Sequence, residues 1–368
     1  MLKKISKFHE PEINMLNKHI GIVPNSIDYS HAQDRRRYIP FFKRFHIPYE
    51  TADYNNDYDI LYLSLSADLN QWCNYKNKQL DKNKNVKVIL DLSDNYLVTN
   101  PFNDFLRSIF HFLSGRTKVL KFSYKRTIMD MLKCTDVLIC GSEEQKNFLD
   151  RIHNNVIVVR DYFYDDIKSI KKDYTLINPN ELNIVWEGFS HGNKKVFEFI
   201  ENVISGIKNY KITLHFITDP EYCEFGTKYF CKSTYSVLKQ IFSKTNIKFY
   251  LYPWNPITFS NIVKSCDFAI IPIPNDDLAL SKPENKLLLF WSIGVPVITT
   301  STSSYKRVMD KINEDFCCSE NFEWKDKILK LAEDKGVREK YMLNALEFLN
   351  SNCTKEIIFN SYNEIFFK

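Results

Sequence analysis

Ten short apolar runs, separated by stretches of helical length, are the feature that most constrains what this chain can fold into. The runs are rich in Val, Ile, Leu and Phe, and most do not alternate polar with apolar residues. Strands that are buried on both faces of a parallel sheet have this pattern. The ten runs are His19–Val23, Asp59–Leu63, Val86–Asp91, Asp136–Cys140, Asn155–Val159, Leu182–Trp186, Lys211–Ile217, Ile247–Leu251, Asp267–Ile271 and Val295–Thr299.

Amphipathic stretches of helical length lie between these runs, for example Lys194–Asn209, Pro256–Ser265 and Glu284–Ile293. Strands that alternate with helices predict a doubly wound α/β architecture. The 368 residues are enough for two such domains, each with its own core. We therefore expect two Rossmann-like domains.

The alternation is interrupted once, by a polar stretch between Arg160 and Glu181 that ends in turn residues. We interpret it as an interdomain linker. The predicted organisation is an N-terminal domain over 1–160, a linker over 161–181, a second domain over 182–350 and a C-terminal helix over 351–368. That last helix is expected to pack back toward the first domain.

Composition narrows the class of protein. Apolar residues make up 44% of the chain and charged residues 26%, which is typical of a globular protein. The net charge of +5 is too small to indicate nucleic-acid binding. The nine cysteines form no C-x-x-C pair, so we expect reduced thiols. The first residues hold no apolar leader segment, and no apolar stretch approaches the ~20 residues of a membrane span, so we expect a cytoplasmic protein.

The first candidate site is the loop Trp186–Lys195, where two of the nine glycines fall within five residues between a buried strand and a helix. Backbone N–H groups at such a helix start attract phosphate, and lysines can add positive charge. A tight strand–helix turn with solvated lysines accounts for the same pattern. The candidate donor-binding residues in this loop are Gly188, Ser190, Gly192, Lys194 and Lys195.

A second candidate is Trp254, which follows the predicted strand Ile247–Leu251. Its planar ring is suited to border a nucleobase. The alternative is a tryptophan that covers the core, with the flanking prolines setting a turn and starting a helix.

The third and most informative candidate is the polar start of the helix Glu284–Ile293. Free N–H groups and basic side chains at a helix start suit a diphosphate. Gly294 is expected to end the helix. The candidate residues here are Ser281, Lys282, Glu284, Asn285 and Lys286.

This segment resembles the donor-binding motif of the GT-B glycosyltransferases grouped with family 4, also called group 1. The matching residues are Asn285, Lys286, Leu287, Leu288, Gly294, Pro296, Val297 and Ile298. The loop after Trp186 and the segment Tyr252–Trp254 are similar in order and spacing to two further loops of that family, over roughly 181–310. The resemblance implies a GT-B fold, in which two Rossmann-like doubly wound domains face a central cleft.

The resemblance also implies the activity: transfer of a sugar from a nucleotide-sugar donor to a glycan or lipid-linked acceptor. The implied setting is the synthesis of bacterial surface polysaccharide, either capsule or lipopolysaccharide. Such enzymes often carry two glutamates eight positions apart, and the corresponding residues here are Ser281 and Leu289. Neither side chain is a carboxylate, so ribose binding is expected to differ.

Three other functions remain open. They are a GT-B nucleotide-sugar epimerase, a polymer-forming transferase with a cytidine donor, and a non-catalytic binding subunit of a glycan-assembly complex. A metal-dependent GT-A enzyme would need an Asp-x-Asp motif after a strand. The pair Asp57 and Asp59 precedes a strand instead, so we interpret it as a solvated turn and expect no metal and no other cofactor.

The first domain is expected to bind the acceptor through the loops that follow its strands. Asp28 and His31 lie in the loop after the first strand, and Asp94 follows the strand Val86–Asp91. Each is a candidate general base, although a lone Asp or His in such a loop is often a helix cap. The run Arg35-Arg36-Arg37 is interpreted as a solvated helix face.

The segment 103–126 interleaves six basic residues with Phe, Ile and Leu and contains one acidic residue. This composition suits a peripheral helix at the anionic inner face of the cell membrane. An amphipathic helix packed on the sheet is the alternative.

Overall fold

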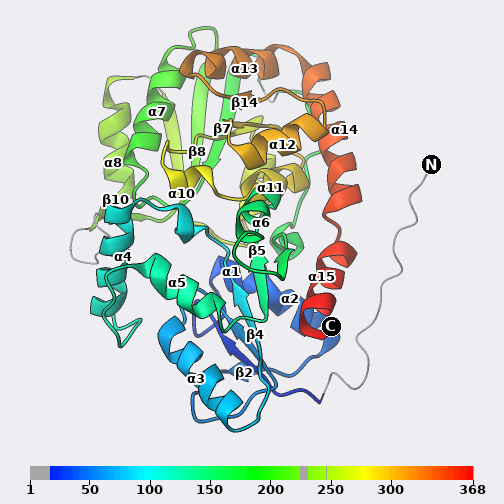
Figure 1. Cartoon of the computed structure of the whole chain (residues 1–368). Coiled ribbons are helices and arrows are strands. Elements are labelled where there is room, and N and C mark those ends of the chain that lie inside the picture. The colour runs from blue at the N-terminus through cyan, green and yellow to red at the C-terminus, as the bar shows by residue number, and fades with distance from the viewer. Residues whose placement is uncertain (1–16, 177, 224–230, 246, 368) are drawn as a thin grey trace. The chain divides into compact units, whose positions relative to one another are not determined.

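The computed structural model describes residues 17–176, 178–223, 231–245 and 247–367. The N-terminal residues, for which the sequence predicts no leader, lie outside these ranges. The described chain divides into two compact units (Figure 1). The first comprises 1–162, Ser281–Pro283 and Cys353–Lys368, and the second comprises Phe163–Leu280 and Glu284–Asn352.

The first unit is built on a six-stranded parallel sheet with the order β2-β1-β3-β4-β5-β6. Its strands are β1 (Ile20–Val23), β2 (Glu50–Thr51), β3 (Ile60–Leu63), β4 (Lys87–Asp91), β5 (Val137–Cys140) and β6 (Val156–Val158). Its helices are α1 (Ala32–Arg35), α2 (Tyr38–Phe45), α3 (Leu69–Asp81), the 3₁₀ turn η2 (Tyr96–Val98), α4 (Pro101–Leu113), α5 (Tyr124–Leu132), α6 (Glu143–Leu149) and α15 (Lys355–Phe367).

The core of this unit explains why its strands do not alternate. Every residue of β3 and β5 is buried, because helices cover both faces of the sheet. One core cluster joins Trp72 of α3 and Ile128 of α5 to Leu90 of β4. Asn100 and Gly115 mark the two ends of α4. The Asn100 side chain accepts a hydrogen bond from the N–H of Asn103, and Gly115 has φ of 72°.

The second unit is built on another six-stranded parallel sheet, with the order β11-β8-β7-β12-β13-β14. Its strands are β7 (Glu181–Glu187), β8 (Lys211–Ile217), β11 (Lys248–Tyr252), β12 (Phe268–Ile271), β13 (Val297–Thr300) and β14 (Cys317–Cys318), with an antiparallel pair β9 (Glu221–Cys223) and β10 (Cys231–Ser233). Its helices are the 3₁₀ turns η3 (Tyr164–Asp166) and η5 (Phe242–Lys244), and α7 (Lys194–Ser205), α8 (Thr234–Ile241), α9 (Phe259–Lys264), α10 (Asp277–Leu280), α11 (Asn285–Ile293), α12 (Ser303–Lys311), α13 (Asn321–Glu333) and α14 (Lys335–Asn352).

Gly294 ends α11 as predicted. Its φ is 84°, and a Cβ at this position would lie 2.4 Å from the carbonyl oxygen of Lys171. The segment before β7 therefore packs against the end of α11, and the N–H of Lys171 donates to the carbonyl of Ile293 at 2.7 Å. The ammonium of the same lysine donates to the carbonyl of Cys266 at 2.6 Å. The stretch 161–181, which we interpreted as an interdomain linker, is thus hydrogen-bonded to the second unit through Lys171.

All ten predicted strands are present, with boundaries that differ by at most two residues. One expectation about the cysteines is wrong, because Cys73 of α3 and Cys134, just after α5, are joined by a disulfide. Their Cα atoms are 5.7 Å apart since α3 and α5 pack side by side on the sheet. Five other cysteines are free and buried: Cys140, Cys266, Cys317, Cys318 and Cys353.

Candidate functional site

The strand order of the second unit places its candidate site. The chain enters the sheet at β7, extends to one side through β8 and β11, and then crosses to the other side at β12. This is the 3-2-1-4-5-6 order of dinucleotide-binding folds. Ligands in such sheets bind at the carboxyl ends of the two strands where the direction reverses. Here those strands are β7 and β12.

The loop after β7 and the start of α11 meet at this reversal. The Lys286 ammonium donates to the carbonyl of Glu187 at 2.7 Å, and it lies 3.3 Å from the carboxylate of the same residue. Gly188 has no room for a side chain, because a Cβ would lie 2.9 Å from the Trp186 ring and 3.1 Å from the Lys286 nitrogen. The glycine therefore lets a cation approach the backbone of the loop.

The rest of this loop is held by the neighbouring strand connections. Ser190 is fully buried, and its hydroxyl donates to the carbonyl of Glu221 at 2.8 Å. Gly192 has φ of 74°, which glycine adopts without strain. Lys194 and Lys195 are exposed, and Lys194 lies 3.8 Å from Glu198 one turn along α7.

Both predicted phosphate-facing helices lack a side-chain cap. Asn193 at the start of α7 and Glu284 at the start of α11 make no capping hydrogen bond to the first turn. The Asn193 amide donates instead to the carbonyl of Phe189 at 2.7 Å. Neither N-cap side chain occupies the first-turn N–H groups of its helix, so these groups are suited to an anion.

Glu284 is buried and serves the structure around the site. Its carboxylate lies 2.9 Å from the guanidinium of Arg307 on α12, and its side chain is 1% exposed. Burial, followed by the charges of Glu284 and Glu187, raises the pKa of Tyr305 well above its ordinary value. Tyr305 thus lies near both carboxylates. Asn285 is half-buried, and its side-chain oxygen has no hydrogen-bond partner among the described residues.

Two candidates of this segment, Ser281 and Lys282, fall in the short stretch that groups with the first unit. Lys282 is exposed and Ser281 is half-buried. Leu289, at the second position where a carboxylate is missing, is buried in α11.

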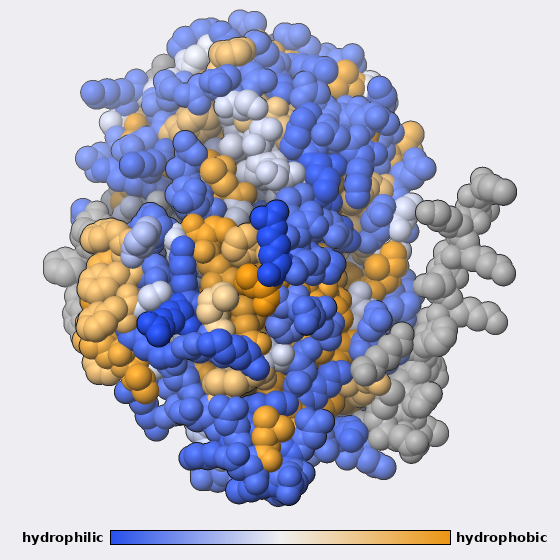
Figure 2. All heavy atoms as spheres, viewed as in Figure 1, coloured by the Kyte–Doolittle hydropathy of each residue, from blue (hydrophilic) through white to orange (hydrophobic). Residues whose placement is uncertain are grey.

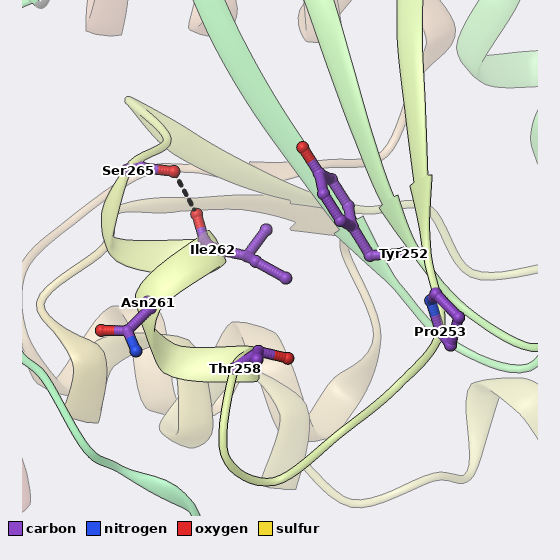
Figure 3. Close-up of a pocket in the computed structure, with 6 residues that line it drawn as sticks. All are labelled: Tyr252, Pro253, Thr258, Asn261, Ile262 and Ser265. Carbon is purple, nitrogen blue, oxygen red and sulfur yellow. Dashed lines mark hydrogen bonds between the residues drawn. The ribbon is translucent and has the colours of Figure 1, made fainter.

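A cavity of about 480 Å³ lies beside the predicted base-binding segment. Tyr252 and Pro253 at the end of β11 form one side, and one face of α9 forms the other. Figure 3 shows the Ile262 side chain pointing from α9 toward the Tyr252 ring. Trp254 is half-buried, with its ring 6.0 Å from that of Phe259, so it covers part of the core and keeps part of its surface exposed.

His215 was not among the predicted residues, because a histidine inside a strand-like run carries no signal. It bridges Asn183 of β7 and Tyr252 of β11, with ring nitrogens 3.1 Å from the Asn183 oxygen and 3.3 Å from the Tyr252 hydroxyl. Burial lowers the pKa of His215 to about 4, so the ring is neutral at pH 7. It fixes the orientation of Tyr252 beside the cavity.

The first unit also has a reversal of strand order, between β1 and β3. The loops after these strands touch there, since the Ser66 hydroxyl donates to the Asn25 side-chain oxygen at 3.0 Å. Buried Asp34 organises the loop after β1. Its carboxylate accepts hydrogen bonds from the N–H groups of Asn25 and Ser26, both at 2.9 Å, and from the Tyr38 hydroxyl at 2.8 Å.

The three candidate bases lie in the loops after β1 and β4, in different environments. Hydrogen bonds from the backbone and hydroxyl of Ser30 lower the pKa of exposed Asp28. His31 caps α1, and its ring accepts from the N–H of Gln33 at 3.3 Å. Asp94 is half-buried and its carboxylate is 3.5 Å from both the Gln33 amide and the Tyr96 hydroxyl. Gln33 thereby links the loops after β1 and β4.

The interpretation of Arg37 as a solvated residue is wrong. Arg37 is fully buried, with its guanidinium 2.6 Å from the Asp91 carboxylate and 3.1 Å from that of Asp161. The Tyr62 hydroxyl also donates to Asp91. The neighbouring Arg35 and Arg36 are half-buried.

Two features of the described residues bear on possible partners. In those ranges no group of three or more His, Cys, Asp or Glu side chains has the arrangement to hold a metal ion. Nor does any helix in them have the length and apolar character to cross a membrane. The acidic pair Asp57 and Asp59 is engaged by the protein: Asp57 accepts from the Gln79 amide, and Asp59 accepts from the N–H of His19, both at 2.8 Å.

Comparison with known proteins gives no match in sequence: no family model matches the chain, and neither does any curated protein. Solved structures do match in fold. A glycosyltransferase from Rickettsia africae ESF-5 superposes with a TM-score of 0.58 at 12% identity, covering 95% of this chain and 98% of that protein. The α-glucosyltransferase AGT, solved with UDP, gives 0.55 at 13% identity, covering 95% and 100%.

TarM gives a TM-score of 0.56 at 13% identity over 84% of this chain, which spans 55% of TarM's length. At such identities the likeness establishes the fold. The chain has the two Rossmann-like units, each with a six-stranded parallel sheet, of the GT-B glycosyltransferases.

Proposed function

We propose that the chain is a glycosyltransferase that takes a sugar from a nucleotide-sugar bound at the β7–β12 reversal of the second unit. The observation that carries this proposal is the contact of Lys286 with the Glu187–Gly188 loop. It puts a cation, a glycine backbone and an uncapped helix start together where parallel sheets bind nucleotides.

The chemistry follows from the charge that develops during transfer. As the bond between the anomeric carbon and the phosphate oxygen breaks, negative charge builds on the departing diphosphate. Lys286 and the first-turn N–H groups of α7 and α11 would stabilise that charge, supported by Gly188, Gly192, Lys194 and Lys195. Glu284 acts indirectly, by holding α12 against the start of α11 through Arg307.

The acceptor hydroxyl must lose a proton as the new bond forms. Among the three candidates, we favour Asp94 as the base. The Asp28 carboxylate is occupied by Ser30 and the His31 ring by the N–H of Gln33. The Gln33 amide and the Tyr96 hydroxyl are both 3.5 Å from the Asp94 carboxylate. These hydrogen bonds are weak, so this carboxylate is the most available of the three to accept a proton.

We further propose a uridine diphosphate sugar as the first donor to test and a glycan or lipid-linked acceptor in bacterial surface-polysaccharide synthesis. TarM has been solved with UDP and α-GlcNAc-glycerol, and AGT with UDP. The proposed place of action is the inner face of the cell membrane, without a metal ion.

Calorimetric titration with UDP, GDP, CDP and CMP tests the donor site, with each run repeated in EDTA. We expect one diphosphate to bind, equally well in EDTA. Replacing Lys286 with Met should weaken this binding about tenfold or more, because a charge-assisted contact to phosphate is lost. The matched control is Lys306→Met on α12, whose ammonium is 2.7 Å from Asp310 and which should leave binding unchanged.

The titration, together with incubation of the chain with the matching nucleotide-sugar, separates the alternatives. Preference for CMP or CDP would favour the polymer-forming transferase with a cytidine donor. A bound nucleotide-sugar that is interconverted without an acceptor would identify an epimerase. If no nucleotide binds, the chain is a non-catalytic subunit and the proposal fails.

A further inference from the structure

Helix α4 is oriented with its polar side inward. Its buried residues are Asp104, Ser108 and His111, which lie one turn apart on a single face. A helix packed on a soluble protein normally buries its apolar stripe and exposes its polar one. The sequence-based alternative, an ordinary amphipathic helix packed on the sheet, therefore does not describe α4.

Specific contacts fix this orientation. The Asp104 carboxylate accepts hydrogen bonds from the Ser123 hydroxyl at 2.6 Å and from the N–H of Lys125 at 2.8 Å. The Ser108 hydroxyl donates to the carbonyl of Lys121. The His111 ring lies 4.4 Å from that of Tyr124 on α5. The polar face is thus paired with the protein, and a rotation of the helix would break these contacts.

The outward side of α4 and the following loop form a continuous apolar surface, which we call the α4 face. Figure 2 shows it as an apolar area at the place of α4 in Figure 1. The rings of Phe105 and Phe122 stack within it at 6.2 Å. Its exposed members are Phe102, Phe105, Leu106, Phe110, Phe112, Leu113, Val119, Leu120 and Phe122. An exposed patch of this kind marks a binding surface.

The charge around the α4 face indicates what binds it. Residues 103–126 carry six cationic side chains and one carboxylate, and that carboxylate, Asp104, is buried. Lys121 is paired with Asp130 at 2.9 Å, whereas Lys118 and Arg126 are exposed. A second copy of the chain would bring cations against cations. An anionic lipid surface offers both an apolar interior and negative head groups.

We propose that the α4 face docks the protein on an anionic bilayer, with its Phe and Leu side chains inserted at the boundary between head groups and acyl chains. The rigid polar contacts of α4 keep these side chains presented to the lipid. The role of this docking in presenting a lipid-linked acceptor rests on the proposed function. The docking itself does not.

Flotation of the full chain with vesicles tests the proposal, because it needs no catalytic activity. Vesicles of phosphatidylcholine with about one-third phosphatidylglycerol are compared with vesicles of phosphatidylcholine alone. The test variant is Leu113→Ser/Phe122→Ser, whose residues are 77% and 71% exposed. The matched control is Leu343→Ser/Phe322→Ser on α14 and α13, with 69% and 71% exposure.

We expect the wild type and the control to float with the anionic vesicles. The test variant should bind about tenfold or more weakly, because two large apolar side chains no longer leave water. Lys118→Glu/Arg126→Glu should weaken binding to a similar extent, and added salt should weaken the wild type. Circular dichroism confirms that each variant is folded.

Two results would overturn the proposal. One is equal flotation of the wild type and the test variant. The other is a wild-type dimer in sedimentation that the test variant converts to a monomer, with no vesicle binding by either. Absence of nucleotide binding by the wild type and by every variant, with vesicle binding by the wild type intact, would instead refute the proposed function alone.

Discussion

At the scale of single residues, the buried pair of Arg37 and Asp91 is the most consequential arrangement in the first unit. Burial raises the pKa of Asp91, and the adjacent guanidinium opposes that effect. Tyr62 donates a further hydrogen bond to the carboxylate. Because both charges are out of water, each depends on the other for compensation.

Replacing Arg37 with Met is therefore expected to destabilise the first unit by about 3–5 kcal/mol, since the Asp91 charge is left buried without its partner. Urea unfolding followed by circular dichroism measures the loss. The double variant Arg37→Met/Asp91→Leu should recover most of it. Equal losses in the single and double variants would show that packing, and not charge, is what Arg37 contributes.

The sequence could not distinguish Arg37 from Arg35 and Arg36. All three are arginines in one short run, and the partners of Arg37 are 54 and 124 positions away. Pairing over such distances is decided by the tertiary fold. By contrast, Gly188 and Lys286 could be singled out as candidates because a close backbone approach and a helix start leave a local signature.

At the scale of elements, the parallel strands were predictable because burial on both faces makes an unbroken apolar run. β2 and β14 were missed because two residues are too short to show any period. For α4 the helical period was visible, but the period alone does not say which face is inward. The inward side is set by Asp104, Ser108 and His111 and by their partners in the following loop and α5.

The stability of α4 should depend on pH through His111. Burial, followed by the positive charges of Arg116 and Arg107, lowers the pKa of His111 to about 4, from an ordinary value of 6.5. Between these two values the unfolded chain binds a proton that the folded chain does not. Stability is therefore lost as the pH falls from about 6.5 toward 4.

Replacing His111 with Phe keeps a ring against Tyr124 and removes the titrating group. The free energy of unfolding should then vary less with pH, by up to about 1.4 kcal/mol per pH unit in that window. Urea titrations at several pH values measure this slope. His215, with a pKa also lowered to about 4 by burial, should keep part of the dependence. Exposed His46, at φ of 51°, can become Asn as the control.

At the scale of the whole molecule, the order of segments along the chain differs from their grouping into the two units. The chain forms the first unit, then the second, and its last helix, α15, belongs to the first unit again. The sequence predicts α15 as a helix, but it does not identify the partners of this helix, because they lie more than 300 positions earlier in the chain. The Phe366 ring is 4.8 Å from that of Phe42 on α2 and 5.9 Å from that of Tyr62 on β3.

A substitution in α15 should therefore affect the first unit alone. Phe366 is 2% exposed, so Phe366→Ala is expected to cost about 3–5 kcal/mol, because a large cavity opens among aromatic rings. Scanning calorimetry should show that the first unit unfolds at a lower temperature. The unfolding temperature of the second unit, identified as the transition that nucleotide raises, should not change. Ile357→Ala on the same helix, 38% exposed, should move neither. A downward shift of the nucleotide-sensitive transition in Phe366→Ala would mean that the two units unfold as one, since the described rings that contact Phe366 belong to the first unit.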